Sequence, residues 1–269
     1  MSVLAEPTFA WEPLTPRGVA AFARASLERL FIVQGIFALI AAAAVGWLLT
    51  DGIFPTVVAA IGELPDTGQI RAGRLDWQDD SPLILGEGKI LSCSVDLEHA
   101  GALRSPADFQ LEFGRNSLLV ISLLGEMELA YPPEYVFAAN QRDLRPMWGA
   151  WSPDILGLAA VGTFVGLLLS WMVLATVYCF PVWLICFFSN RDLGLLASWK
   201  LAAAALLPGA MLFSCSLVLY EAGLLDLIQL GFAFGMHVIV GWIYLFVAPM
   251  FLNRMVPAMK KNPFLTEAK

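Results

Sequence analysis

Four long apolar runs constrain the fold of this chain more than any other feature. A run of roughly 18 or more apolar residues is typical of a membrane-crossing helix, since about 20 residues cover the ~30 Å hydrocarbon core. The chain is 58% hydrophobic and 14% charged, whereas soluble domains are about 45–50% apolar and about 25% charged. Its 269 residues are too few to bury all four runs in one soluble core. We therefore expect a membrane α-helical bundle of four transmembrane helices, at residues 31–50, 155–188, 197–220 and 227–252.

Two of these runs contain a proline that bears on the path of the chain. Residues 155–188 would form a helix of about 51 Å at 1.5 Å per residue, which is too long for one straight span and too short for two spans with a turn. We expect a single span with a kink or break at Pro181. In the third run, Pro208 and Gly209 form a candidate hinge, or else a kink that neighbouring helices fill.

The distribution of basic residues predicts the orientation. Cytoplasmic connections carry an excess of Lys and Arg. With both termini in the cytoplasm, the short outer connections next to the spans hold four acids and no base: Asp51, Asp154, Glu221 and Asp226. The same orientation places nine bases inside: Arg17, Arg24, Arg29, Arg191, Lys200, Arg254, Lys260, Lys261 and Lys269.

This orientation divides the chain into three parts outside the spans. Residues 1–30 form a cytoplasmic segment, in which Thr15 and Pro16 have the residue types that start a helix. We expect this helix to be amphipathic and to lie at the membrane surface. Residues 253–269 form a cytoplasmic tail, and residues 51–154 form a domain outside the cytoplasm.

The outer segment carries the acidity of the chain and only one cysteine. Residues 62–150 hold 14 acidic and 7 basic side chains, whereas the rest of the chain holds 9 of each. An acidic domain argues against nucleic acid as a partner. Cys93 has no second cysteine within this segment, so no disulfide is expected there. A multi-pass protein of a bacterial inner membrane fits these features.

Alternation of apolar and polar residues predicts strands within the outer segment. A period of two places apolar side chains on one face, as a half-buried antiparallel strand requires. Gly114–Asn116 is a plausible turn between two such strands. The pattern predicts a small antiparallel β domain, either a sandwich or a partly closed barrel, with a single sheet against the membrane as the alternative. The predicted strands lie within residues 70–77, 83–85, 91–97, 109–113, 118–123 and 127–131.

His237 is the candidate functional residue within the membrane. It lies ten residues into the fourth run, near the middle of the bilayer, where an ionisable side chain is costly and often functional. The alternative is a neutral imidazole that hydrogen-bonds to a neighbouring span. No intramembrane Asp or Glu is available as a proton-relay partner, so the structural role is favoured.

Two GxxxG patterns indicate sites of close helix packing. Gly162 and Gly166 lie in the second run, and Gly231 and Gly235 lie in the fourth. Small residues four apart allow two helix backbones to approach. These patterns indicate packing and no chemistry.

No motif in the sequence predicts a catalytic, metal or cofactor site. The acidic cluster at Asp76, Asp79 and Asp80 lacks EF-hand spacing, and His99 has no metal-ligating companion at useful spacing. Nucleotide-binding and hydrolase fingerprints are also lacking. We therefore expect no cofactor and no identifiable catalytic residue.

Three functions are compatible with this organisation. The first is a non-enzymatic accessory or scaffold protein, whose outer domain binds a protein, a peptide or an envelope ligand. The second is a subunit of a transporter or channel that uses His237 and oligomerises, because four spans are few for a transporter. The third is a membrane-embedded enzyme that acts on lipid. We favour the first, with the lipid bilayer and either a protein partner or a second copy as partners.

Overall fold

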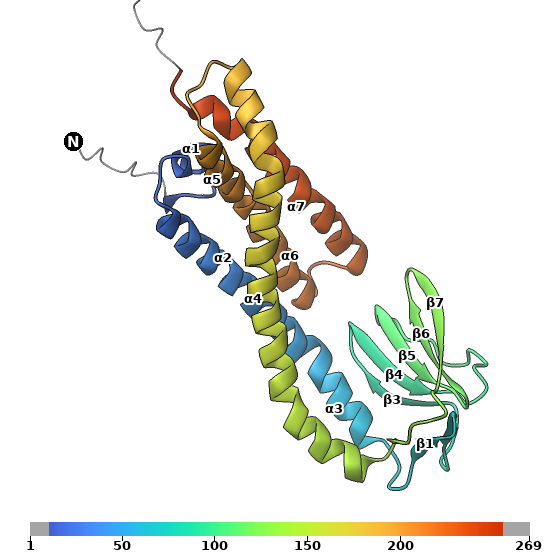
Figure 1. Cartoon of the computed structure of the whole chain (residues 1–269). Helices are drawn as coiled ribbons and strands as arrows, with labels where there is room; N and C mark the ends of the chain where they lie inside the picture. The colour runs from blue at the N-terminus through green and yellow to red at the C-terminus, as the bar shows by residue number, and fades with distance from the viewer. Residues whose placement is uncertain (1–10, 255–269) are drawn as a thin grey trace, which may run out of the picture. The chain divides into compact units, whose positions relative to one another are not determined.

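Four helices in the structure are long and apolar enough to cross a membrane. The structure is a computed structural model that describes residues 11–254 (Figure 1). The four overlap the four apolar runs, so the predicted number of long apolar helices is confirmed. The predicted tail at 253–269 lies almost entirely outside the described residues. The four helices cover Leu27–Gly62, Gln141–Phe188, Leu195–Glu221 and Leu227–Phe251.

The chain divides into two compact units, and several long helices contribute to both. The terminal unit contains the described residues up to Phe37, Leu167–Met211, and those from Gly235 onward. The β unit contains Ala38–Gly166 and Leu212–Phe234. We describe each unit by itself.

The terminal unit begins with α1, Pro16–Phe22, which starts where the sequence predicts. The Oγ1 atom of Thr15 accepts a hydrogen bond from the backbone N–H of Gly18 at 3.0 Å, which is the contact of an N-cap residue. The apolar side of α1 packs against α5, Leu195–Ala205. Lys200 of α5 donates to the carbonyl of Ala25 at 2.6 Å.

The third long helix is interrupted next to its proline. Helix α5 ends at Ala205, and α6 covers Leu207–Glu221. Pro208 has no N–H to donate to the carbonyl of Ala204, so a regular helix cannot continue through this point. Helix α4, by contrast, is continuous from Gln141 to Phe188, including Pro181. The fourth long helix consists of α7, Leu227–Val247, followed by the 3₁₀ helix Ala248–Phe251.

Helix α4 begins earlier than the apolar run predicts, at Gln141 instead of residue 155. The Oδ1 atom of Asn140 accepts from the N–H of Asp143 at 2.9 Å, and its amide donates to the Asp143 carboxylate at 3.0 Å. These bonds satisfy donors that are otherwise orphaned at a helix start. The first turns of α4 are polar, so apolar patterning alone does not reveal them.

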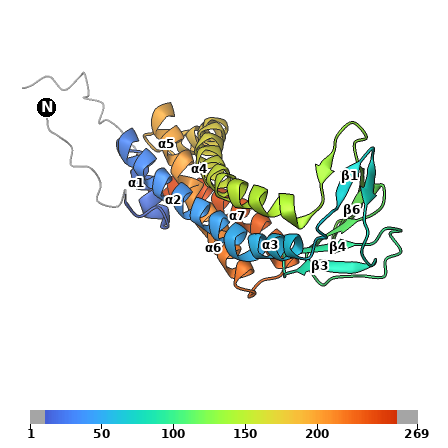
Figure 2. The ribbon, with the colours of Figure 1, turned by 90° about the horizontal axis from the view of Figure 1, so that it is seen from below.

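The first long helix continues beyond the predicted span. Helix α2, Leu27–Trp47, passes into a π-helical turn at Leu48–Ile53 and then into α3, Phe54–Gly62. Helix α3 packs against strands β3 and β4 of the β unit (Figure 2). Gly86 makes this packing possible, because an added Cβ would lie 2.6 Å from the Thr56 carbonyl oxygen.

The β unit contains two small open sheets. The larger has the strand order β3-β4-β5-β6-β7, and the smaller has the order β2-β1-β8. The predicted strands are confirmed, but residues 70–77 form a hairpin of two strands. The strands are β1 Gln69–Arg71, β2 Arg74–Asp76, β3 Leu83–Glu87, β4 Leu91–Val95, β5 Phe109–Phe113, β6 Ser117–Ser122, β7 Gly125–Ala130 and β8 Phe137–Ala138.

Two predictions about the β domain are wrong. The larger sheet does not close, so it is no barrel. It is also not fully antiparallel, because β4 and β5 pair in parallel from Leu91↔Phe109 to Val95↔Phe113. A parallel pair requires a crossover connection, which residues 96–108 provide. Strands β5, β6 and β7 then follow one another in antiparallel order. The two edge strands of the sheet are β3 and β7.

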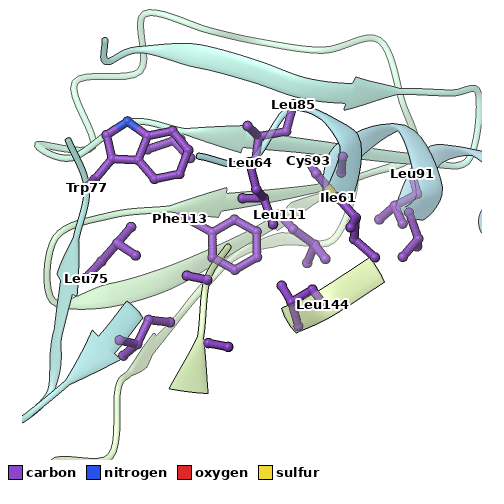
Figure 3. A pocket seen from close by; sticks show the side chains of 16 residues that line it. Ile61, Leu64, Leu75, Trp77, Leu85, Leu91, Cys93, Leu111, Phe113 and Leu144 are labelled. Atoms are coloured by element: carbon purple, nitrogen blue, oxygen red, sulfur yellow. The ribbon is translucent and has the colours of Figure 1, made fainter. Parts of the chain in front are cut away.

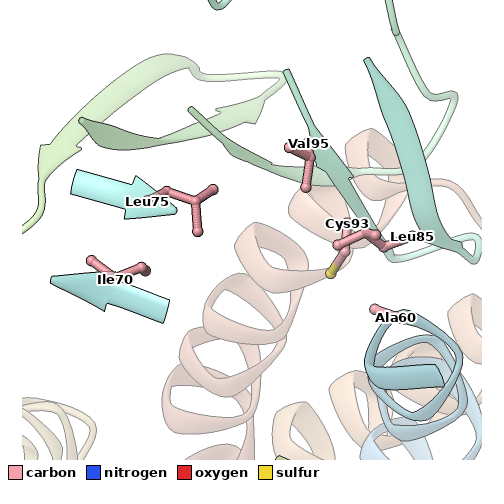
Figure 4. Packing of buried hydrophobic residues seen from close by; sticks show 6 residues of the cluster. All are labelled: Ala60, Ile70, Leu75, Leu85, Cys93 and Val95. Atoms are coloured by element: carbon pink, nitrogen blue, oxygen red, sulfur yellow. The ribbon is translucent and has the colours of Figure 1, made fainter. Parts of the chain in front are cut away.

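The core of the β unit lies between the sheets and α3 (Figure 4). Ile70 and Leu75 come from the smaller sheet, Leu85 and Cys93 from the larger one, and Ala60 from α3. Burial of these side chains holds three elements together, because each would otherwise expose an apolar face.

Candidate functional site

An apolar cavity of about 240 Å³ lies beside this core (Figure 3). None of the sixteen described residues that line it is charged. Its wall comes from α3, from both sheets and from the first turn of α4. The side chains central to it are Ile61, Leu64, Leu75, Trp77, Leu91, Leu111, Phe113 and Leu144.

Regular spacing in the sequence builds the walls of this cavity. Val57, Ala60, Ile61 and Leu64 recur at intervals that place them on one face of α3. On the strands, alternation aims Leu91, Cys93 and Val95 of β4, with Leu111 and Phe113 of β5, into the cavity. The helical spacing and the strand alternation can be read from the sequence. The unfilled space between α3 and the sheet cannot.

The cavity is partly open to its surroundings and is larger than an ordinary packing defect. Protein interiors are packed as densely as organic crystals, with few voids larger than a water molecule. Apolar cavities of about 150 Å³ stay dry and take up small apolar molecules. The cavity of about 240 Å³ is therefore large enough to hold an apolar group.

The cavity lining suits binding and provides no acid or base. Cys93 is the one lining residue with an ionisable side chain, and burial raises its pKa to about 11. The thiol therefore stays neutral and unreactive at physiological pH. Burial also raises the pKa of the Tyr131 hydroxyl, which packs nearby and donates to the Gly114 carbonyl at 3.1 Å.

The opposite face of the larger sheet carries a polar network that sequence reasoning missed. His99 Nδ1 lies 2.7 Å from Glu112 Oε1, and His99 Nε2 lies 3.2 Å from Ser117 Oγ. The Ser117 hydroxyl donates to Glu128 at 2.6 Å. Glu112 is fully buried and His99 is partly buried. The four residues come from the crossover, β5, β6 and β7, so sequence spacing gave no signal that they meet.

The direction of these hydrogen bonds argues for a structural role. Ser117 has one hydroxyl hydrogen, and it points to the Glu128 carboxylate, which only accepts. The same hydroxyl oxygen lies 3.2 Å from His99 Nε2, but its single hydrogen is already directed at Glu128. A serine nucleophile needs the reverse, with the histidine accepting the hydroxyl proton. The network therefore fixes the crossover over the sheet.

A second polar cluster joins the β3–β4 turn to the connection between α6 and α7. The ammonium of Lys89 donates to the carbonyl of Tyr220 and, at 3.0 Å, to that of Leu225. The same ammonium lies 4.3 Å from the centre of the Tyr220 ring. The hydroxyl of Tyr220 donates to the Asp108 carboxylate at the start of β5.

The terminal unit brings two of the predicted residues together. A Cβ added to Gly209 would overlap the carbonyl oxygen of His237. The hinge candidate Gly209, next to Pro208, is therefore a point of close backbone contact between α6 and α7. Only glycine leaves room for this contact, because a side chain at position 209 would collide with the backbone of His237.

The four glycines of the GxxxG patterns lie elsewhere. A Cβ added to Gly162, Gly166, Gly231 or Gly235 would meet no described atom within 4 Å. Among the described residues, these glycines therefore do not mark contacts between helices of the same chain. The predicted role of these glycines in helix packing stays a prediction.

No metal site is visible in the part of the chain that the structure describes. No group of three or more His, Cys, Asp or Glu side chains there could hold an ion, and the cluster at Asp76, Asp79 and Asp80 is not such a group. Comparisons with protein-family models, curated proteins and solved structures gave no match. The apolar cavity is therefore the strongest candidate site.

Proposed function

We propose that this chain is a non-enzymatic integral membrane protein whose outer β unit binds the apolar part of an amphiphile. Four helices cross the bilayer, both termini lie in the cytoplasm, and the cavity takes up an acyl chain. The cavity carries this proposal, because its sixteen lining residues include no charge and leave about 240 Å³ unfilled. A polar headgroup would stay outside it, since burying an unpaired polar group is costly.

The position of α3 supports a ligand that comes from the membrane. Helix α3 supplies one wall of the cavity through Val57, Ala60, Ile61 and Leu64. It also belongs to Leu27–Gly62, the first of the four helices long and apolar enough to span a bilayer. One continuous helical segment therefore connects a membrane span to the cavity.

Transport and catalysis have less support. A transport path between α6 and α7 needs open space between these helices, whereas Gly209 packs closely against the His237 backbone there. A serine hydrolase needs a free hydroxyl beside its base, whereas Ser117 donates to Glu128.

The proposal is tested by filling the cavity. Leu111→Trp adds a bulky ring inside it, and Leu119→Trp adds the same ring on the other face of the neighbouring strand β6. We expect the wild-type protein and the Leu119→Trp control to retain a bound amphiphile when purified in mild detergent, detected by native mass spectrometry. The Leu111→Trp variant should lose it. An empty wild-type protein, or equal retention in both variants, would contradict the proposal.

A further inference from the structure

The β6–β7 hairpin ends in two exposed leucines. Leu123 is 64% exposed and Leu124 is 98% exposed. Hairpin turns are usually built from Gly, Asn, Asp, Pro and Ser, which water solvates well. Ser122 and Gly125, which has φ of +123°, follow that preference, but the two residues between them do not. Two adjacent leucines at the end of a hairpin present an apolar surface without a partner among the described residues.

Strand register places this tip at a definite end of the larger sheet. Ser122 pairs with Phe109, and Phe109 pairs with Leu91. The β6–β7 tip therefore lies at the same end of the sheet as the β3–β4 turn with Lys89. Two strand spacings separate β4 from β6, or about 10 Å.

That end of the sheet is bonded to the connection between α6 and α7. Lys89 donates to the carbonyls of Tyr220 and Leu225, and Asp108 accepts from the Tyr220 hydroxyl. Helices α6 and α7 belong to the third and fourth potential spans. If these helices cross the bilayer, their connection lies at the outer membrane surface, and the hairpin tip lies at the same level.

The tip is also free of charges that would oppose entry into lipid. Residues 117–125 contain no Asp, Glu, Lys or Arg. The next acidic residue, Glu126, has a counterion, because Arg104 donates to its carboxylate at 3.4 Å. An uncharged apolar tip beside span ends has the chemistry of a shallow membrane anchor.

We propose that Leu123 and Leu124 insert into the outer leaflet of the bilayer beside the α6–α7 connection. This inference rests on the proposed membrane orientation. The hairpin then holds the free side of the sheet at the lipid surface, while Lys89 holds the side near β3. The larger sheet is attached to the membrane at two points, and the cavity lies in a domain that cannot swing away from its source of acyl chains.

Site-directed fluorescence tests the insertion in the full-length protein. Cys179 and Cys215 are replaced by Ala, and Leu124→Cys is labelled with an environment-sensitive dye in phosphatidylcholine nanodiscs. Asn116→Cys, in the turn at the other end of β6, is the matched control. The dye at position 124 should show blue-shifted emission, quenching by nitroxide-labelled lipid and loss of iodide quenching. The dye at 116 should be quenched by iodide alone.

A third position separates the two proposals. Val173 is 63% exposed near the middle of the second apolar run, so dye on Val173→Cys reports whether α4 lies in lipid. Lipid quenching at 173 with iodide quenching at 124 would overturn the insertion alone. Iodide quenching at both positions would overturn the assignment of α4 as a membrane span, and with it the proposed function. Protection of position 124 from both quenchers would indicate a protein occupant and would also overturn the insertion.

Discussion

Gly209 and Gly166 are both glycines in apolar helices, but only Gly209 has a neighbour where a side chain would lie. An added methyl group at Gly209 meets the His237 carbonyl, which belongs to a helix backbone and cannot rotate away. The GxxxG spacing drew attention to Gly166, whereas Gly209 was noted only for its proline neighbour. Spacing along one helix shows which residues share a face, but not which face another helix covers.

We predict that Gly209→Ala destabilises the protein by about 1–3 kcal/mol, the usual cost of overpacking. The matched variant Gly166→Ala has open space and gains helix propensity of up to about 1 kcal/mol, so it should be neutral or stabilising. Thermal unfolding in detergent, followed by circular dichroism, measures both. Equal midpoints for the two variants would show that α6 and α7 do not touch at Gly209.

Burial of Cys93 should make the free energy of unfolding decrease at alkaline pH. Burial raises its pKa from 9.0 to about 11, so the folded state holds the proton longer than the unfolded chain does. This contribution to stability is full below pH 9 and is lost as pH rises towards 11. A shift of two units corresponds to about 2–3 kcal/mol.

We therefore expect the wild type to lose more stability between pH 8 and pH 10.5 than Cys93→Ala does. Denaturation of each protein at both pH values gives the comparison, and taking differences removes the fixed cost of the deleted sulfur. Tyr131 shifts in the same direction, so the variant keeps part of the pH dependence. Identical losses in the two proteins would show that Cys93 is not buried.

At the level of elements, most strands were predictable from their apolar and polar residues, although burial varies from β4, which is almost wholly buried, to β7, which is exposed along its whole length. Alternation in 109–113 predicted one strand, and the turn at Gly114–Asn116 predicted its partner at 118–123. The parallel pairing of β4 with β5 was not predictable, because alternation does not indicate the direction of a neighbouring strand. The cavity depends on this pairing, since β4 and β5 together supply five of its residues.

The hydrogen bonds from Lys89 join the β3–β4 turn to the α6–α7 connection, and their loss should be measurable. The Lys89 ammonium donates to the carbonyl of Tyr220, in the last turn of α6, and to that of Leu225, in the connection that follows. Hydrogen bonds to charged groups contribute about 1.5–3 kcal/mol. We predict that Lys89→Met increases hydrogen exchange in residues 221–227 and leaves exchange in β5 and β6 unchanged.

Arg104→Met is the matched control for this prediction. It removes an ion pair with Glu126 that is more than half exposed, and such pairs contribute about 0.2–1 kcal/mol. Exchange near α6 should stay at the wild-type rate in this control. If Lys89→Met behaves like Arg104→Met, the β3–β4 turn is not bonded to the α6–α7 connection in solution.

For the whole molecule, the orientation in the membrane is the prediction on which the others depend. Asn116→Cys should react with a membrane-impermeant maleimide added to intact cells, whereas Asp192→Cys should react only after the cells are opened. Cys93 is a poor reporter because its thiol is buried. Reaction of Asp192→Cys in intact cells would show that the protein has the opposite orientation.

The separation of Lys89 from its partner has a consequence for biogenesis. Lys89 and Tyr220 are 131 residues apart in the chain. Ribosomes add about 5–20 residues per second, so Lys89 leaves the ribosome roughly 7–26 s before Tyr220 does. The two sheets are therefore synthesised before their attachment to the α6–α7 connection can form, and until then only the helices that flank the sheets hold them. A nascent chain stalled before residue 220 would display this domain tethered on one side, open to chaperones and proteases.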